Sequence, residues 1–173
     1  EAARKSGLDI EYVEGDYVTD DLGSGYDLAM MIYCDLGALS PDGRTAVLRK
    51  ARSCLAPGGA FVFDFVDESF LGAVEPGRRW TMEASGFWSP RPHLALEETR
   101  HYPELKMVQR MTLLAEEGTG RTERFMIRDW YFTEGEMREL AREAGFGSCD
   151  FHRGLLPKPV WGAADPIFAV ARA

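Results

Sequence analysis

Groups that could move a proton lie in one stretch of the sequence, residues 79–132. His101 and His93 carry imidazole rings, which can take a proton from a hydroxyl or an amine near neutral pH. Tyr131 places a phenol at the end of the same stretch. We expect His101 and Tyr131 on the catalytic side of a reaction, facing an acceptor. A solvent-exposed histidine is the common alternative for either imidazole.

The same stretch is rich in aromatic side chains, which could form the wall of a binding pocket. The aromatic core of a small sheet would explain the same density. For the pocket interpretation, the candidate substrate contacts are Trp80, Trp88, Arg128 and Trp130. Asp35 is a further candidate, because its carboxylate could orient an acceptor, although it could equally cap the loop that follows.

A single carboxylate, Asp64, interrupts an apolar run near its end. A buried carboxylate needs hydrogen-bond partners. The position is therefore consistent with a role in a site as well as with a local structural role.

Several kinds of chemistry have no support in the sequence. There is no Ser-His-Asp order, no H-E-x-x-H and no Walker sequence. The three cysteines show no C-x-x-C spacing, which argues against a zinc site and for free thiols in a reducing, cytoplasmic compartment. A net charge of −8 without a basic stripe argues against a nucleic-acid partner, and no apolar run is long enough to cross a membrane.

Two apolar runs joined by an amphipathic segment form the centre of the predicted fold. Residues 26–33 and 60–66 are nearly continuous apolar runs, which indicates parallel strands covered on both faces. Residues 41–55 predict a helix between them, with Ser40 as N-cap and Pro41 in the first turn. Strand, helix and strand make one right-handed crossover.

The 79–132 stretch predicts an antiparallel insertion after this crossover. Four runs of period-two character indicate its strands, at residues 80–84, 94–102, 107–114 and 123–132. Thr133-Glu134-Gly135-Glu136 then matches a capping box and predicts a helix. Strands at 146–152 and 166–172 complete the chain.

The first residues predict the end of a helix and a short strand. Residues 1–7 indicate helical turns closed by Gly7, and residues 8–14 indicate the strand. Because Glu1 already lies in the predicted helix, the sequence begins inside an element.

Three short motifs, taken in order, resemble those of class I S-adenosylmethionine-dependent methyltransferases. Leu55-Ala56-Pro57-Gly58-Gly59 before an apolar strand is similar to that family's L-x-P-G-G turn. Tyr26-Asp27-Leu28 resembles the entry to its fourth strand, and Val13-Glu14-Gly15-Asp16 the end of its third. The resemblance implies a single methyltransferase-like domain over residues 1–173 with an α/β, Rossmann-like parallel sheet of order 3-2-1-4-5-7-6. It also makes residues 79–132 an antiparallel β cap over the site.

The resemblance implies S-adenosylmethionine as cofactor and places its contacts at strand ends. The implied cofactor residues are Asp16, Tyr17, Ile32, Tyr33 and Cys34. The alternative for Asp16 is a loop-entry aspartate that bonds nearby amides, and for Ile32 and Cys34 it is core packing.

One part of the family pattern is missing from the sequence. The first two strands and the Gly-x-Gly-x-Gly loop that approaches the cofactor are absent, which implies a domain truncated at its N-terminus. Strands 3 and 4 would then not be neighbours, and two central edges would be open. We expect the chain to be part of a longer protein, or else a partner chain to fill the gap.

The function implied by the resemblance is methyl transfer to an oxygen or nitrogen of a small molecule. Family members that modify DNA bases or glutamine often carry N/D-P-P-Y, where this chain reads Tyr33-Cys34-Asp35-Leu36, so that substrate class is disfavoured. A non-catalytic relative, or an incomplete fragment that binds no cofactor, is the main alternative. A nucleotide-linked dehydrogenase lacks support, because its glycine fingerprint is equally absent. A homodimer remains open.

Overall fold

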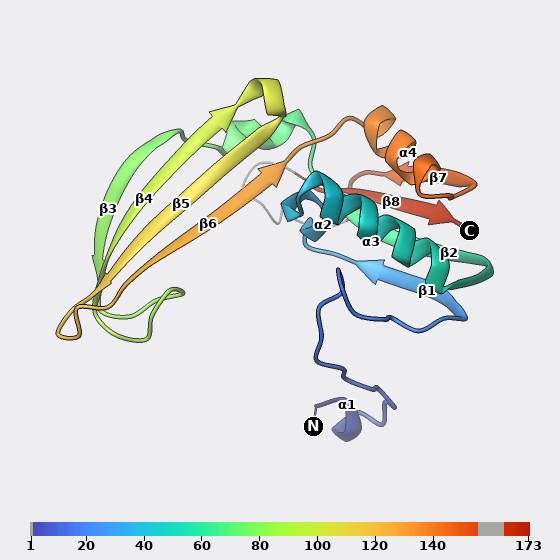
Figure 1. Ribbon diagram of the computed structural model, residues 1–173, viewed down its shortest axis with the longest axis horizontal. Helices are drawn as coiled ribbons and strands as arrows, with labels where there is room; N and C mark the ends of the chain where they lie inside the picture. The colour runs from blue at the N-terminus through green and yellow to red at the C-terminus, as the bar shows by residue number, and fades with distance from the viewer. Residues whose placement is uncertain (1, 156–164) are drawn as a thin grey trace.

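The structure is a computed structural model, and it describes residues 2–155 and 165–173. Within these residues the strands form two four-stranded sheets, with orders β1-β2-β8-β7 and β3-β4-β5-β6. Figure 1 shows the second sheet extending away from the first, which carries the helices. The protein is therefore a mixed α/β fold with a separate antiparallel sheet.

The predicted strand–helix–strand crossover is confirmed. β1 (Tyr26–Met31) and β2 (Leu55–Phe65) pair in parallel, and α3 (Pro41–Cys54) connects them after the short helix α2 (Asp35–Ala38). Ser40 caps α3, because its side chain accepts a hydrogen bond from the Gly43 N–H at 3.2 Å.

The glycine pair expected in a turn lies inside β2. β2 begins directly after α3, and its register against β1 shifts between the pairs Tyr26–Leu55 and Leu28–Ala60, so the intervening residues of β2 form a bulge. Gly58 has φ +80°, and a Cβ at Gly59 would lie 2.9 Å from the Tyr26 carbonyl oxygen. Gly58 thus has the left-handed backbone that favours glycine, but it lies in β2, and the expectation of a separate turn before the strand was wrong.

The C-terminal elements complete the first sheet. β8 (Ile167–Arg172) lies between β2 and β7 (Ser148–His152) and is antiparallel to both, so the sheet is mixed rather than parallel throughout. α4 (Glu134–Glu143) begins with the predicted capping box at Thr133. α3 and α4 pack on one face of this sheet, where Phe61, Phe63 and Phe65 lie in the main core with apolar side chains of both helices.

Among the described residues, nothing covers the other face of β1 or its outer edge. Leu28 and Met30, which alternate with Ala29 and Met31, are 52% and 60% exposed. β1 pairs with β2 alone among the described residues. The predicted strand at 8–14 does not form after α1 (Ala2–Lys5), and its Tyr12 and Val13 are exposed. A strand needs a partner for its backbone groups, and no strand of the described part of the chain pairs with this segment.

The second sheet confirms the antiparallel prediction. Its strands follow the 3₁₀ helix η1 (Glu68–Ala73), and the 3₁₀ helix η2 (Pro103–Leu105) joins the second and third of them. Neighbours in the sheet are antiparallel in every pair. The four strands are β3 (Gly77–Glu83), β4 (His93–Tyr102), β5 (Met107–Glu116) and β6 (Thr122–Trp130).

A buried arginine connects the two parts of the molecule. The Arg44 side chain on α3 donates to the carbonyl oxygens of Leu36 at 3.2 Å and Leu39 at 3.0 Å. Its guanidinium also lies over the rings of Phe132 and Trp130, at 4.5 Å and 5.3 Å from their centroids. Burial lowers the pKa of Arg44 to about 10, which leaves the group charged at neutral pH.

Candidate functional site

The carboxyl end of β1 carries an unusual backbone conformation. Tyr33 and Cys34, which follow the strand, have φ values of 75° and 59°, in the left-handed region that non-glycine residues seldom occupy. Asp64 on β2 faces this peptide with a side chain that is only 4% exposed. Its carboxylate accepts the Tyr33 N–H at 3.2 Å and the Cys34 N–H at 2.8 Å.

Burial and neighbouring carboxylates shift the acid–base properties of this end of the sheet. Burial raises the pKa of the Cys34 thiol well above its ordinary value, and the charge and hydrogen bond of Asp64 raise it further. Burial also raises the pKa of Asp64, although the amide hydrogen bonds from Cys34 and Tyr33 oppose that rise. Cys34 is therefore a protonated thiol near neutral pH and is unsuited to act as a nucleophile.

The second sheet contributes a polar pair to the same region. Asp129 on β6 forms an ion pair with Arg110 on β5, whose guanidinium lies 5.5 Å from the ring centroid of Phe70. The Asp129 charge also raises the pKa of Cys34, which places both residues in one electrostatic neighbourhood. Burial raises the pKa of Asp129 itself, and Arg110 opposes that shift.

The two predicted catalytic residues contact each other. The Nε2 atom of His101 lies 3.0 Å from the Tyr131 hydroxyl oxygen, within hydrogen-bond distance. Tyr131 is buried in a small cluster with Val66, Phe70 and Val108, where Cys34 packs against it. Burial raises the pKa of the Tyr131 phenol, so its proton is retained at neutral pH. The pair therefore lies beside the end of β1, as a group acting on an acceptor would need to.

Asp16 and Tyr17 lie in a loop that is fixed to α3. The Val18 N–H donates to Asp16 Oδ1 at 2.8 Å, and the Asp16 N–H donates to Asp20 Oδ2 at 2.8 Å. Lys50 donates to the carbonyl oxygens of Val18 and Asp20, at 2.8 Å and 2.7 Å. The hydrogen bonds that the alternative interpretation of Asp16 expected are thus present, and a cofactor role for this residue stays a prediction.

An apolar cavity of about 340 Å³ lies beside β1 and α3. Three of the predicted contacts line it, Tyr17, Ile32 and Asp35. Burial raises the pKa of Tyr17, and the charges of Asp35 and Asp16 raise it further, so these groups are close enough to interact. The rest of the lining is apolar and consists of Leu22, Ala29, Met30, Met31, Val47, Ala51, Cys54 and Phe61.

A second cavity, of about 380 Å³, lies along the second sheet. Trp88 lines it and stacks on Phe125 with ring centroids 4.5 Å apart. Thr112 and Arg110 line it as well. Arg110, Thr112 and Phe125 lie on one face of the sheet, called the covered face below. Arg110, at the border of the cavity, forms its ion pair with Asp129 on that face.

Three predicted substrate residues are not part of either cavity. Trp80 pairs with Leu96 across the sheet and is 67% exposed on the face opposite to Phe125. Arg128 is exposed on that same outer face, where its guanidinium contacts the Met126 sulfur. Trp130 packs against the main core beneath Arg44. None of these three side chains meets Trp88, because the alternation along the strands puts them on the other face.

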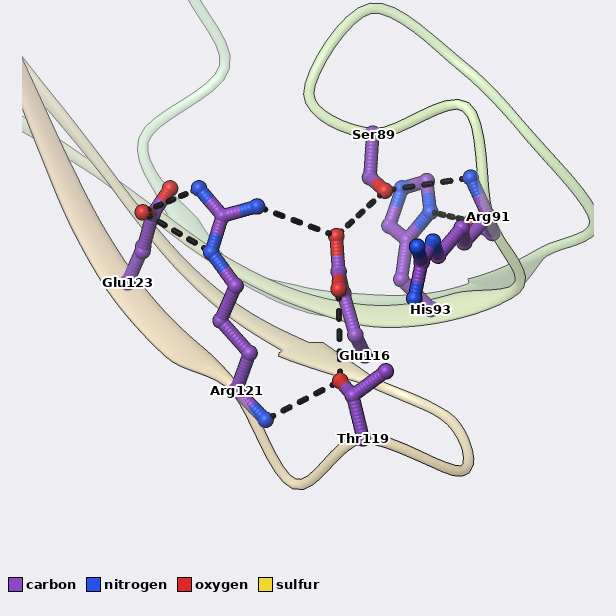
Figure 2. Close-up of polar contacts among 7 residues, drawn as sticks. All are labelled: Ser89, Arg91, His93, Glu116, Thr119, Arg121 and Glu123. Atoms are coloured by element: carbon purple, nitrogen blue, oxygen red, sulfur yellow. Dashed lines mark hydrogen bonds and ion pairs between the residues drawn. The ribbon is translucent and has the colours of Figure 1, made fainter.

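His93 belongs to a network at the far end of the second sheet, shown in Figure 2. Its ring is only 1% exposed, and Nδ1 lies 2.7 Å from the Arg91 carbonyl oxygen. The Ser89 hydroxyl donates to Glu116 Oε1 at 2.6 Å, and Thr119 donates to the other oxygen of this carboxylate at 3.2 Å. These contacts hold the loop between β3 and β4 at the far end of the sheet, and His93 lies there. Of the two histidines proposed as proton acceptors, His101 is the one near the end of β1.

Sequence reasoning missed Arg110 and Asp129 as members of the site. Alternation along residues 123–132 predicts that Asp129 shares a face with Phe125 and Ile127, and that signal was visible. The pairing of Val108 with Asp129 places Arg110 diagonally beside the carboxylate, and this register is not encoded in either strand alone. The signal for Asp64 was its position within an apolar strand.

The described residues contain neither a candidate metal site nor a helix suited to crossing a membrane. In residues 2–155 and 165–173 there is no group of three histidine, cysteine or acidic side chains that could hold a metal ion. None of the helices in that part of the chain has the length and apolar character that crossing a bilayer requires.

Known proteins are similar to this chain in structure only. No family model and no curated protein matches the sequence. An S-adenosylmethionine-dependent methyltransferase from Clostridium acetobutylicum matches with a TM-score of 0.64 and 12% identity, over 99% of this chain and 68% of that one. The methyltransferase CcbJ from Streptomyces caelestis matches with 0.61 and 22% identity, over 93% and 62%. The sugar N-methyltransferase KedS8 from Streptoalloteichus matches with 0.60 and 18% identity, over 99% and 67%.

These matches show the fold. The chain has the α/β fold of S-adenosylmethionine-dependent methyltransferases together with its antiparallel sheet, and it spans 62% to 68% of the lengths of the three structures. What each of those proteins methylates is a property of that protein.

Proposed function

We propose that this chain is the part of a class I methyltransferase that holds the acceptor and one wall of the donor site, and that it methylates an oxygen or nitrogen of a small molecule. The observation that carries the proposal is the convergence of polar groups where the two sheets meet. Asp64, Asp129 and the pair of His101 and Tyr131 all lie around the carboxyl end of β1. In open α/β sheets, ligands bind at such strand ends.

S-adenosylmethionine is the cofactor that this proposal requires, and it supplies a methyl group already activated by a sulfonium. Asp16 and Tyr17 would hold its adenine side, with Ile32, Tyr33 and Cys34 against the methionine side. Support for this assignment comes from the apolar cavity, which brings Tyr17 and Ile32 together. These residues would contact only one side of such a molecule. The glycine loop that approaches the cofactor from the other side in the family does not occur in the sequence.

The open side of the first sheet is where the rest of the site would be supplied. Leu28 and Met30 on β1 are exposed, and Val62 on β2 extends the same face. Burial of apolar surface is worth about 25 cal/mol per Å², so a further layer against this face would be favourable. We infer that a preceding segment of a longer protein, or a partner chain, pairs with β1 and completes the donor site.

The acceptor would lie along the covered face of the second sheet. Trp88 and Arg110 line the cavity there, and Asp129, the ion-pair partner of Arg110, is close enough to Cys34 for its charge to raise the pKa of that thiol. His101 would take the proton that a hydroxyl or ammonium acceptor loses, with Tyr131 holding the ring by their hydrogen bond. The second sheet is then a cap on the acceptor side, and Asp35 would face the acceptor from α2.

The setting proposed for this activity is a reducing cytoplasm. Cys34, Cys54 and Cys149 are free thiols, as that compartment would keep them. The net charge of −8 favours a small metabolite over a nucleic acid as partner. A homodimer is compatible with the exposed apolar outer face of the second sheet around Trp80 and Met82.

Calorimetric titration tests the proposal directly. The chain, and the longer protein if it is encoded with one, would be titrated with S-adenosylmethionine, S-adenosylhomocysteine and NADH. We expect binding of both adenosyl compounds and none of NADH, with weaker binding by the chain alone because one wall of the site is open. Binding of NADH alone would overturn the proposal.

A non-catalytic methyltransferase-like domain is the second candidate. The observation that favours it is the missing glycine loop, whose backbone would otherwise approach the cofactor. Absence of binding by both the chain and the longer protein would establish this candidate and reject the enzyme.

A further inference from the structure

The peptide after β1 has a rare backbone conformation, and the buried Asp64 side chain hydrogen-bonds to it. Tyr33 and Cys34 are two of the three non-glycine residues with positive φ among the described residues, and they are adjacent in sequence. Such conformations persist only where surrounding contacts determine them, and they gather at functional sites. Tyr33 is 65% exposed, so packing of its own side chain does not account for the conformation.

The Asp64 carboxylate has the geometry to impose this conformation. Oδ2 accepts the Tyr33 N–H at 3.2 Å and Oδ1 accepts the Cys34 N–H at 2.8 Å, so each oxygen serves one amide. β2 brings the carboxylate there because Met31 pairs with Phe63, which puts Asp64 next to the residue that follows β1. In an amide side chain an NH₂ group would replace one of these oxygens and would face an N–H donor instead of accepting from it.

We propose that Asp64 is a positioning residue, whose carboxylate holds the Tyr33–Cys34 peptide in its left-handed conformation and thereby sets the direction in which the chain enters α2. That entry matters because α2 lies against the second sheet, where a Cβ on Gly37 would come within 3.0 Å of the Trp130 carbonyl oxygen. Asp64 thus connects the end of β1 to the placement of the second sheet. The link to methyl transfer rests on the proposed function, but the conformational role does not.

A glycine substituted for Tyr33 provides the decisive comparison. Glycine adopts positive φ without the steric cost that a side chain adds. If Asp64 holds a strained peptide, Asp64→Asn allows Tyr33 to relax and recover that strain, whereas glycine has none to recover. Asp64→Asn should therefore destabilise the protein less when residue 33 is tyrosine than when it is glycine. The exposed Tyr33 side chain makes few contacts to lose, so Tyr33→Gly is a mild background for the comparison.

Thermal unfolding of four proteins measures this coupling: the original chain, Asp64→Asn, Tyr33→Gly and the double variant. We expect Asp64→Asn to lower Tm by about 4 °C in the Tyr33→Gly background and by about half as much or less in the original background, at the 2–4 °C per kcal/mol of chains this size. Equal losses in the two backgrounds would overturn the proposal. Failure of Asp64→Asn alone to fold would be a larger loss than the proposal allows and would overturn it as well.

Cys34 provides an independent reporter. Loss of the Asp64 charge and hydrogen bond lowers the pKa of the thiol, so alkylation by iodoacetamide at pH 8 is expected to become about tenfold faster in Asp64→Asn. Peptide mapping would show Cys54 and Cys149, both buried, at their original rates. Asp129→Asn is the matched control, because Asp129 acts on Cys34 by charge while its hydrogen bond goes to Arg110.

The control and the cofactor separate the possible failures. We expect no coupling in Tm between Asp129→Asn and Tyr33→Gly. A coupling as large as that of Asp64→Asn would mean that the loss of a negative charge alone, and not the loss of the hydrogen bonds, produces the effect. Affinity for S-adenosylhomocysteine should fall about tenfold in Asp64→Asn. If neither the original chain nor the longer protein binds S-adenosylhomocysteine, the proposed function fails, while the Tm coupling still decides the role of Asp64.

Discussion

The two sheets of this protein reach stability in different ways. The second sheet is a meander in which each strand pairs with the next along the chain, and its pairs carry cross-strand ion pairs such as Arg79 with Glu97. The first sheet has a dense core under α3 and α4, yet β1 is paired on one side and bare on one face. In the meander, each strand finds its partners within the same sheet. In the first sheet, the described residues leave one edge and one face of β1 uncovered.

The largest expected effect comes from the core of the first sheet. Phe63→Ala removes a fully buried ring that lies 5.1 Å, between centroids, from Phe61, and should cost about 3–5 kcal/mol of unfolding free energy. Urea denaturation measures it. Phe87→Ala is the counterpart in the second region, where the ring is 90% exposed, and should stay within about 0.5 kcal/mol. Similar losses for both would contradict the placement of the core.

A smaller effect is expected at the junction between the second sheet and α4. Thr133→Ala removes the side chain that accepts the Glu136 N–H at 3.2 Å, and should cost about 1 kcal/mol. The measurement is again urea denaturation. Thr122→Ala, at the exposed start of β6, is the control, and an equal loss there would argue against the cap.

The bare face of β1 should tolerate a charge. Leu28→Lys is expected to change the stability of this chain by under about 0.5 kcal/mol, because the side chain is already half exposed. In a longer protein whose preceding segment covers β1, the same change should cost about 1–3 kcal/mol, since it buries a charge. A large loss in the chain alone would show that the face is covered from within.

The smallest expected effect is local and depends on pH. The hydrogen bond from Ser89 is the largest cause that holds the pKa of Glu116 below its ordinary value of 4.5. A depressed pKa means that this carboxylate stabilises the folded state fully above about pH 4.5 and loses that contribution as the pH falls below it.

Hydrogen exchange of residues 84–92, corrected for intrinsic rates, would report that loss. We expect faster exchange of this loop at pH 3.5 than at pH 6, while the amides of β5 keep their protection. Ser89→Ala should show the fast exchange at both pH values. A loop that exchanges alike at both pH values in the original chain would refute the role of Glu116.

Elements whose information is local could be predicted from the sequence. The apolar runs around Leu28 and Phe63 predicted parallel strands, and Thr133 with Glu136 predicted the start of α4. The segment around Tyr12 was predicted as a strand and is not one, because a strand exists only with its partner.

The site was only partly predictable for a related reason. His101 and Tyr131 were predicted and do meet, whereas Trp80 and Arg128 lie on the outer face. Both faces of those strands are apolar, so alternation could not decide which one is covered. The contact between Asp64 and the Tyr33 amide depends on the register of two strands, which neither strand contains by itself.

Arg44 has a consequence for how this architecture could change over time. Its guanidinium bonds carbonyl oxygens of Leu36 and Leu39 and lies over Trp130 and Phe132, so one side chain joins residues from both halves of the molecule. An ancestor that exchanged its antiparallel module for another would have had to bring a matching pair of rings along with it. A module exchanged in this way would therefore have to include the residues through Phe132, because the ring of Phe132 contacts Arg44.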